Sequence, residues 1–286
     1  MLNIQAGFYL IRRVGYHIRW LFINSSWLFF KQNNAQHLVN KNYSIGIVTY
    51  FDRYGRFFKP LITRLVSLFP DTEIVIAING YHNKQVQAKY LEQIGAFLAQ
   101  FPNVKIVQFN EPQSLSKLWN LLMVNSLADK TFIFNDDIQI GPQFREDLNQ
   151  SGIMDEEVAL INESWSHYLI SKNTVKKIGW FDERFPAVGN EDEDYECRLV
   201  LNGIYVKNFK IRSLKNIVFK TQNFSWKNTE VVNSKYVRAN QVFFNSKWDV
   251  KEDAENGYTY VRILNKYVCL KAGMETPEFY TSPTTS

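Results

Sequence analysis

The chain has 286 residues, of which 45% are hydrophobic and 15% aromatic, and it carries a formal net charge of +5. This composition excludes an intrinsically disordered chain and provides enough apolar side chains for one large α/β domain with appendages, or for two small domains. Two cysteines, Cys197 and Cys269, are too few for a disulfide framework and lack the spacing of a zinc site, so we expect a reducing compartment.

Residues 1–42 predict a basic, aromatic, amphipathic helical arm. No acidic residue occurs before Asp52, and Arg12, Arg13 and Arg19 fall off the apolar face of a helical wheel. This pattern is typical of peripheral membrane contact, here through residues 1–40. The alternative is an arm that packs on its own domain or on a sister subunit. The uncharged run 20–30 is too short to span a bilayer, no cleavage site for a secretory signal follows it, and its bulky aromatics fit an organelle transit peptide poorly.

Short β-branched runs at 44–50, 73–78, 104–109 and 131–134 then alternate with helix-like segments at 57–69, 83–101 and 114–127. Continuous apolar runs of this length predict strands that are buried on both faces. Their alternation with helices predicts a mostly parallel sheet, whose ligand site lies at the carboxyl ends of the strands. The loops expected to carry function therefore begin at Thr49, Asn79, Asn110 and Asn135.

Further along, the alternation becomes less regular. The pattern predicts strands at 158–162, 167–171 and 204–211, and helices at 174–178 and 195–201. We expect three parts: the arm at 1–42, a central domain at 43–246 and a mixed C-terminal extension at 247–286.

Two groups of carboxylates are candidates for chemistry. Asn135-Asp136-Asp137 directly follows the fourth predicted strand, where hard oxygen ligands can hold a divalent cation and a ribose. The alternative is an Asx-rich turn that only satisfies local N–H groups.

The second group places seven acidic residues in the fifteen positions from Asp182 to Glu196. Acidic residues also suit the start of any helix, which is the simplest explanation for them. A carboxylate among other carboxylates and buried aromatics, however, gains the raised pKa that a general base requires. Within this group we expect Asp194 and Arg198 to be scaffold.

Read in order, these motifs resemble the inverting GT-A glycosyltransferases, in particular the family 2 enzymes of bacterial glycan, lipopolysaccharide and capsule synthesis. The resemblance covers roughly residues 43–225. It rests on the strand that ends Ile-Val-Thr-Tyr50, on Asn135-Asp136-Asp137, and on Gly179-Trp-Phe-Asp-Glu-Arg-Phe followed by Glu191-Asp192-Glu-Asp194 and Arg198. It implies a Rossmann-like GT-A fold with a mostly parallel central sheet flanked by helices.

The resemblance also implies roles for individual residues. Asp192 matches the catalytic base, with Glu191 as an acceptor-binding or orienting residue, and Asp137 matches the metal ligand for Mg²⁺ or Mn²⁺. The residues that match donor-binding positions are Thr49, Tyr50, Asp52, Asn79, Trp119, Asn120, Asn135 and Asp136. The residues expected on the acceptor side are Trp165, His167, Trp180 and Phe181.

The chain departs from the family pattern at the cation. The first position of the acidic motif is Asn135 instead of Asp, and no histidine follows the Glu191–Asp192 pair where the family places a metal ligand. Lys220 stands at or near that position. Our hypothesis is that Lys220 contacts the donor and partly replaces the cation, which makes metal dependence weak; the alternative is an ordinary surface lysine.

The resemblance implies transfer of a sugar from a nucleotide-diphospho donor, expected to be UDP-linked, to a hydroxyl of a glycan or lipid-linked acceptor. Such an enzyme is expected in the cytoplasm, peripheral at the inner face of the cytoplasmic membrane. The alternatives are a non-catalytic binding relative and a nucleotidyltransferase, although the latter lacks its Gly-rich loop. Nucleic acid is not expected as a partner, because the basic residues are dispersed and the candidate site is acidic.

Overall fold

The structure is a computed structural model that describes residues 40–217, 234–250 and 268–270. Almost all of the expected N-terminal arm, most of the C-terminal extension and Lys220 therefore lie outside the described residues. Among the helices that are described, none is long and apolar enough to cross a membrane.

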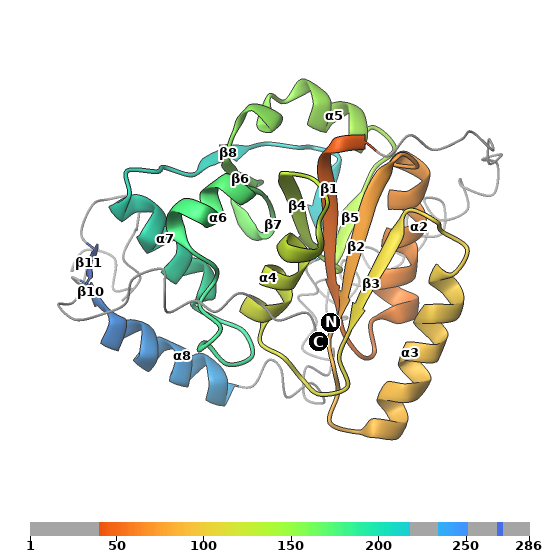
Figure 1. The fold of residues 1–286 in the computed structure, drawn as a ribbon, viewed down its shortest axis with the longest axis horizontal. Coiled ribbons are helices and arrows are strands. Elements are labelled where there is room, and N and C mark those ends of the chain that lie inside the picture. Colours follow the sequence, from red (N-terminus) through yellow and green to blue (C-terminus); the bar gives the residue numbers. More distant parts are fainter. Residues whose placement is uncertain (1–39, 218–233, 251–267, 271–286) are drawn as a thin grey trace, which may run out of the picture. The chain divides into compact units, whose positions relative to one another are not determined.

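The described residues form an α/β fold around a seven-stranded, mostly parallel sheet with the strand order β3-β2-β1-β4-β7-β6-β8 (Figure 1). The strands of this sheet are β1 (Asn40–Thr49), β2 (Thr72–Ile78), β3 (Val104–Gln108), β4 (Lys130–Asn135), β6 (Val158–Ile161), β7 (Ser164–Ser171) and β8 (Lys207–Phe209). Strands β1 to β4 are parallel, whereas β7 is antiparallel to both β4 and β6. The predicted sheet and its location in the chain are confirmed.

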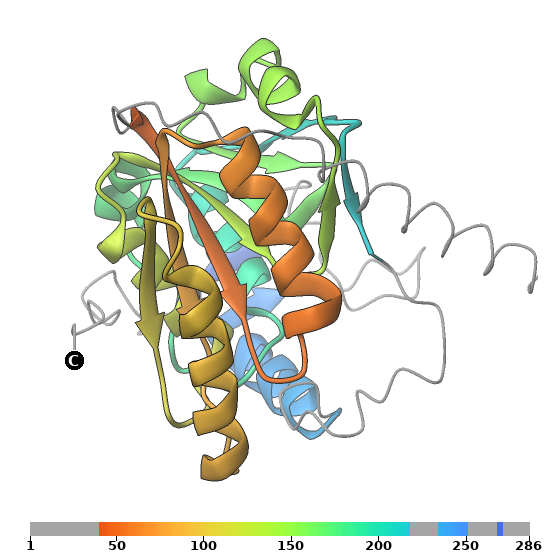
Figure 2. The same ribbon diagram turned by 90° about the vertical axis from the view of Figure 1, so that its right-hand side faces the viewer.

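Helices cover both faces of the sheet (Figures 1 and 2). Helices α2 (Lys59–Leu68) and α3 (Lys84–Leu98) share one apolar core with the side chains of one face, while α4 (Leu115–Asn125), α6 (Lys172–Ile178) and α7 (Glu191–Leu201) share a second core with the other. Local sequence fixes several helix starts. The side chains of Asn83 and Ser114 accept hydrogen bonds from the first turns of α3 and α4, and Pro60 lies in the first turn of α2.

The remaining elements lie outside this sheet. A short pair of strands is formed by β5 (Ile138–Ile140) and β9 (Leu214–Asn216), and a second pair by β10 (Trp248–Val250) and β11 (Val268–Leu270). The other helices are the π-helix η2 (Tyr54–Phe58), α5 (Phe144–Gln150), the 3-10 helix η3 (Ile153–Asp155) and α8 (Ser234–Lys247).

Two expectations about local structure were wrong. Helix α7 begins at Glu191 and not at 195, because acidic residues favour the positive end of the helix macrodipole and the preceding Asn190 has the left-handed φ of 65° that starts the turn. The strand expected at 204–211 shortens to β8, since only Lys207–Phe209 pairs with β6.

A third, smaller core joins α8 to α7. Its buried members are Phe185, Cys197, Phe244 and Trp248. The fully buried Lys247 amine lies 2.8 Å from Asp182 Oδ2 and 2.7 Å from Asp194 Oδ1. Residues 247 and 248, where we expected an extension to begin, are therefore part of this packing.

Arg198 completes this buried ion-pair network. Its Nη2 lies 3.0 Å from Asp194 Oδ2, and the Trp248 indole N–H donates to Asp194 Oδ1 at 2.8 Å. The scaffold role expected for Asp194 and Arg198 is thereby confirmed. A buried carboxyl group needs partners that compensate its lost hydration, and Arg198, Lys247 and the Trp248 indole provide them for Asp194.

Candidate functional site

The carboxyl ends of β1 and β4 meet at one edge of the sheet and bring Thr49 to Asp136. Thr49 Oγ1 donates to Asp136 Oδ2 at 2.6 Å and lies 3.1 Å from the Tyr90 hydroxyl of α3. Asp136 is only 1% exposed. The first expected strand loop and the expected acidic motif are thus in direct contact.

Arg53, which the sequence reasoning did not single out, connects this pair to its surroundings. Its Nη1 lies 2.7 Å from Asp136 Oδ1 and 3.3 Å from Asp137 Oδ2, and its Nη2 donates to the Tyr50 hydroxyl at 2.5 Å. The guanidinium also lies 4.3 Å from the centre of the Tyr50 ring, at cation–π distance. The only sequence signal was an arginine four residues beyond Thr49 in the first strand loop. Asp52 in the same loop is exposed and has a left-handed φ of 71°.

The electrostatics of this edge follow from burial. Burial raises the pKa of Asp136 to about 6, although the Arg53 guanidinium opposes part of that shift. A buried carboxylate without a partner would have an even stronger tendency to take up a proton. Arg53 therefore keeps Asp136 close to its ionised form and is held in place by it.

Asn135 and Asp137 flank this buried pair and have free coordination capacity. Within the described residues, the buried Oδ1 of Asn135 has no hydrogen-bond partner, and the Asp137 side chain is 31% exposed. In the part of the chain that the structure describes, no group of three acidic, histidine or cysteine side chains could hold a metal. These residues fit a cation only in the manner common for Mg²⁺, which is bound by one or two carboxylates together with substrate phosphates.

Asn79 and Asn120 have polar side chains that are engaged with backbone. Asn79 Oδ1 accepts from Gly80 N and Gln113 N, both at 2.8 Å, and its Nδ2 donates to Gln113 O. Asn79 thus ties the loop after β2 to the loop after β3. Asn120 makes paired hydrogen bonds with the Phe181 backbone at 3.0 and 2.9 Å and fixes the loop before α7 in the same way.

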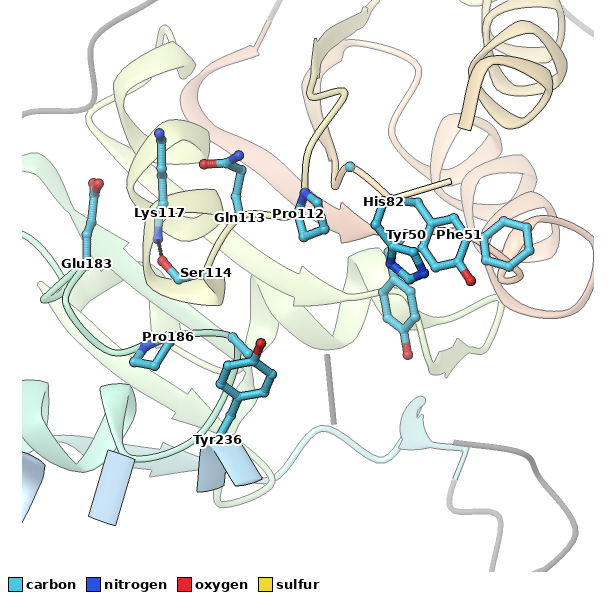
Figure 3. Close-up of a pocket in the computed structure, with 13 residues that line it drawn as sticks. Tyr50, Phe51, His82, Pro112, Gln113, Ser114, Lys117, Glu183, Pro186 and Tyr236 are labelled. Carbon is cyan, nitrogen blue, oxygen red and sulfur yellow. Dashed lines mark hydrogen bonds between the residues drawn. The ribbon is translucent and has the colours of Figure 1, made fainter. Parts of the chain in front are cut away.

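A cavity of about 480 Å³ opens beside this edge (Figure 3). Its lining includes Tyr50 and Phe51 after β1, Tyr81 after β2, and Pro186 in the loop that leads to α7. The rings of Phe51 and Tyr81 stack with centroids 4.5 Å apart. The other lining residues are Gly80, His82, Pro112, Gln113, Ser114, Lys117, Glu183, Ala187 and Tyr236. The cavity therefore has an aromatic wall and charged groups of both signs.

The acid-rich segment forms the first turn of α7. Burial raises the pKa of Glu191 to about 8, and the neighbouring Asp192 charge adds to this shift. The same two causes raise the pKa of Glu193 to about 9. Burial also raises the pKa of Glu196. Glu191 and Glu193 consequently retain protons at neutral pH, whereas Asp192 between them is partly exposed.

Aromatic side chains pack beneath this turn. Trp165 Nε1 donates to Glu196 Oε2 at 3.3 Å, and Phe181 stacks on Tyr195 with centroids 4.1 Å apart. Burial raises the pKa of the Tyr168 hydroxyl, and the nearby Asp192 and Glu191 charges contribute. The structure thus brings Trp165 to the acid-rich turn and places Phe181 in the core behind it.

Three further predicted residues occupy distinct surroundings. Trp119 is buried with its ring centroid 5.0 Å from that of Phe181. Trp180 is half-buried. His167 pairs with Phe134 across β7 and β4, and burial lowers its pKa while the Asp137 charge partly opposes that shift. His167 therefore lies near the acidic motif.

Fold and cavity together define an α/β protein with a candidate ligand site at the carboxyl edge of a mostly parallel sheet. No family model matches the chain, and no curated protein matches it. Among solved structures, residues 1–349 of TarS from S. aureus match with 15% identity and a TM-score of 0.44, over 59% of this chain and 57% of that one. The same fragment in complex with UDP-GlcNAc matches with 14% identity and a TM-score of 0.43, over 59% and 56%. A longer TarS structure matches with 15% identity and a TM-score of 0.42, over 59% of this chain and 35% of that one.

Proposed function

We propose that the chain is an inverting glycosyltransferase that moves a sugar from a nucleotide-diphospho donor, a UDP-sugar, to a hydroxyl of a glycan or lipid-linked acceptor. One observation carries the proposal. The same cavity is lined by the β1 loop, which contacts the acidic motif through Arg53, and by the loop that leads into Glu191 and Asp192. A donor in this cavity would have groups for its leaving diphosphate on one side and a candidate base on the other.

The donor half is supported by the chemistry of its residues. The aromatic wall of Phe51 and Tyr81 suits a nucleotide base, whose faces stack on aromatic rings. Tyr50 lines the cavity and accepts from Arg53, so a diphosphate that extends from the base toward Asp137 would pass the guanidinium. Asp137 and the donor's phosphates would hold Mg²⁺ or Mn²⁺, which when bound supplies charge neutralisation for the leaving diphosphate.

In the half of the site where transfer takes place, Asp192 is the general base that accepts the proton of the acceptor hydroxyl. Its carboxylate takes the proton from the acceptor hydroxyl while that oxygen attacks the anomeric carbon from the face opposite the diphosphate. The new glycosidic bond forms as the bond to the diphosphate breaks, and the electron pair leaves with the diphosphate. The result is a single displacement with inversion. Glu191 orients this turn, because its Oε2 accepts from Gly189 N at 2.5 Å.

The test has two stages. Calorimetric titration with UDP should show binding that uridine alone reproduces only weakly, since the diphosphate contributes contacts to Arg53 and Asp137. UDP release should then appear when a UDP-sugar and a panel of glycan and lipid-linked acceptors are supplied. Binding without turnover across the panel would support a non-catalytic sugar-nucleotide-binding protein, and failure to bind any nucleoside diphosphate would refute both functions.

A further inference from the structure

Helix α8 helps to form the candidate site, although no sequence motif predicted this role. Tyr236, in its first turn, lines the cavity together with Pro186 (Figure 3). One turn later, Asn240 is fully buried. Residues four apart lie on the same face of a helix, so both side chains face the 186–190 loop, which joins the cavity to α7.

The 186–190 loop has an unfavourable backbone conformation. Ala187, Gly189 and Asn190 have left-handed φ values of 56°, 116° and 65°. For residues other than glycine this conformation is unfavourable, and such residues persist only where their surroundings hold them. The loop ends directly at Glu191 and Asp192, so its conformation sets where the first turn of α7 begins.

Asn240 makes three contacts with the backbone of this loop. Its Nδ2 lies 2.9 Å from Pro186 O, 3.1 Å from Val188 O and 2.8 Å from Gly189 O. From the opposite side, Leu115 N at the start of α4 donates to Ala187 O at 2.7 Å. The loop is thus fixed between α8 and α4.

Helix α8 is in turn anchored at its C-terminal end. The buried Lys247 amine pairs with Asp182, in the loop before the cavity wall, and with Asp194, two residues after Asp192. Asn190 Nδ2 also donates to Gln241 Oε1 at 3.3 Å. The helix therefore contacts the segment around the proposed base in its middle and at its C-terminal end.

We propose that Asn240 is a positioning residue, which holds the 186–190 loop so that the cavity wall and Asp192 take their working geometry. The proposal rests on the glycosyltransferase function above. An amide is required at this position because three carbonyl oxygens need a donor, and a carboxylate of the same shape would repel all three. Asn240 itself touches no reacting atom in this scheme.

The test compares Asn240→Asp with Asn245→Asp, which makes the same change on the exposed side of α8. We expect kcat of Asn240→Asp to fall by about 10- to 100-fold, because small displacements of a catalytic group have effects of this size. UDP affinity should change by less than about threefold, since Tyr50, Phe51 and Tyr81 do not depend on Asn240. Asn245→Asp should match the wild type in both.

Thermal unfolding of each variant controls for folding. If Asn240→Asp does not fold, Asn240→Ser, which retains one hydroxyl donor, takes its place with a smaller expected loss of kcat. A folded Asn240 variant with wild-type kcat would overturn the proposal while leaving the glycosyltransferase function intact. A kcat that falls only in proportion to UDP affinity would also overturn it, because the residue would then serve donor binding alone.

Discussion

The two halves of the site bury carboxyl groups by different means. At the β1–β4 edge, Asp136 is compensated by Arg53 at 2.7 Å and by the Thr49 hydroxyl. At the first turn of α7, the raised pKa values of the buried Glu191 and the half-buried Glu193 mean that these groups are largely neutral acids. In the proposed reaction, the first arrangement provides a fixed positive group for the leaving diphosphate. The second provides carboxyls that differ in proton occupancy, which is the arrangement that the proposed proton transfer requires.

The largest effect is expected at the proton-transfer half. Asp192→Asn should lower kcat by about 10²–10⁴-fold, because the amide cannot accept the acceptor's proton. UDP affinity should be retained, since in the proposed reaction Asp192 acts on the acceptor hydroxyl and does not contact the diphosphate. Steady-state UDP release and calorimetry measure the two quantities, and near-normal turnover of this variant would show that another group is the base.

The next effect tests the compensated half. Arg53→Met leaves the buried Asp136 unpaired and should lower the free energy of unfolding by about 3 kcal/mol. The double variant Arg53→Met/Asp136→Asn should recover most of this stability, because no buried charge remains unpaired. UDP binding should stay weak in the double variant, since the guanidinium is still missing.

Chemical denaturation and UDP titration measure these outcomes, with Arg56→Met, on the exposed side of the same helical turn, as the matched control. Recovery of UDP affinity in the double variant would show that Arg53 serves Asp136 alone and not the donor.

The variant Asp137→Ala distinguishes the contribution of the cation to UDP affinity from that of the Arg53 guanidinium. UDP affinity in the presence of Mg²⁺ or Mn²⁺ should fall by about tenfold, which corresponds to about 1.4 kcal/mol. In excess EDTA the variant and the wild type should bind UDP equally. Asp129→Ala, at the opposite end of β4, should behave as wild type in both conditions. An Asp137→Ala protein whose affinity still rises with metal would remove Asp137 from the ligand role.

The smallest effect concerns the neutral acids. The folded-state pKa of Glu193 lies at about 9, above the ordinary value of 4.5, so its contribution to stability is present at low pH and is lost as the pH rises toward 9. Glu193→Gln removes this ionisation, and we expect the fall in Tm between pH 5 and pH 9 to shrink by about 2–4 °C. Glu92→Gln, on the exposed surface of α3, should leave it unchanged. If Tm falls equally between pH 5 and pH 9 for Glu193→Gln and for the wild type, Glu193 is not a neutral acid in the folded protein.

The sheet and the edge that carries the candidate site could be predicted because they depend on local patterns. The apolar runs that form β1 to β4 are continuous, so the strands could be predicted from them. Because the carboxyl ends of parallel strands meet at the edge of the sheet that binds ligands, Thr49 could be expected near Asp136. Arg53 and Asn240 could not be predicted, since their partners lie 83 and about 50 residues away and no local spacing indicates such pairs. The hydrogen bonds between Asn79 and Gln113 could not be predicted for the same reason.

The most direct test of the central claim is a crystal structure of the protein with UDP and Mg²⁺. The proposed function predicts the uracil against the Phe51–Tyr81 wall and the diphosphate between Arg53 and Asp137. It also predicts an open path from the terminal phosphate to Asp192. A nucleotide bound outside this cavity, or a diphosphate directed away from Arg53 and Asp137, would contradict it.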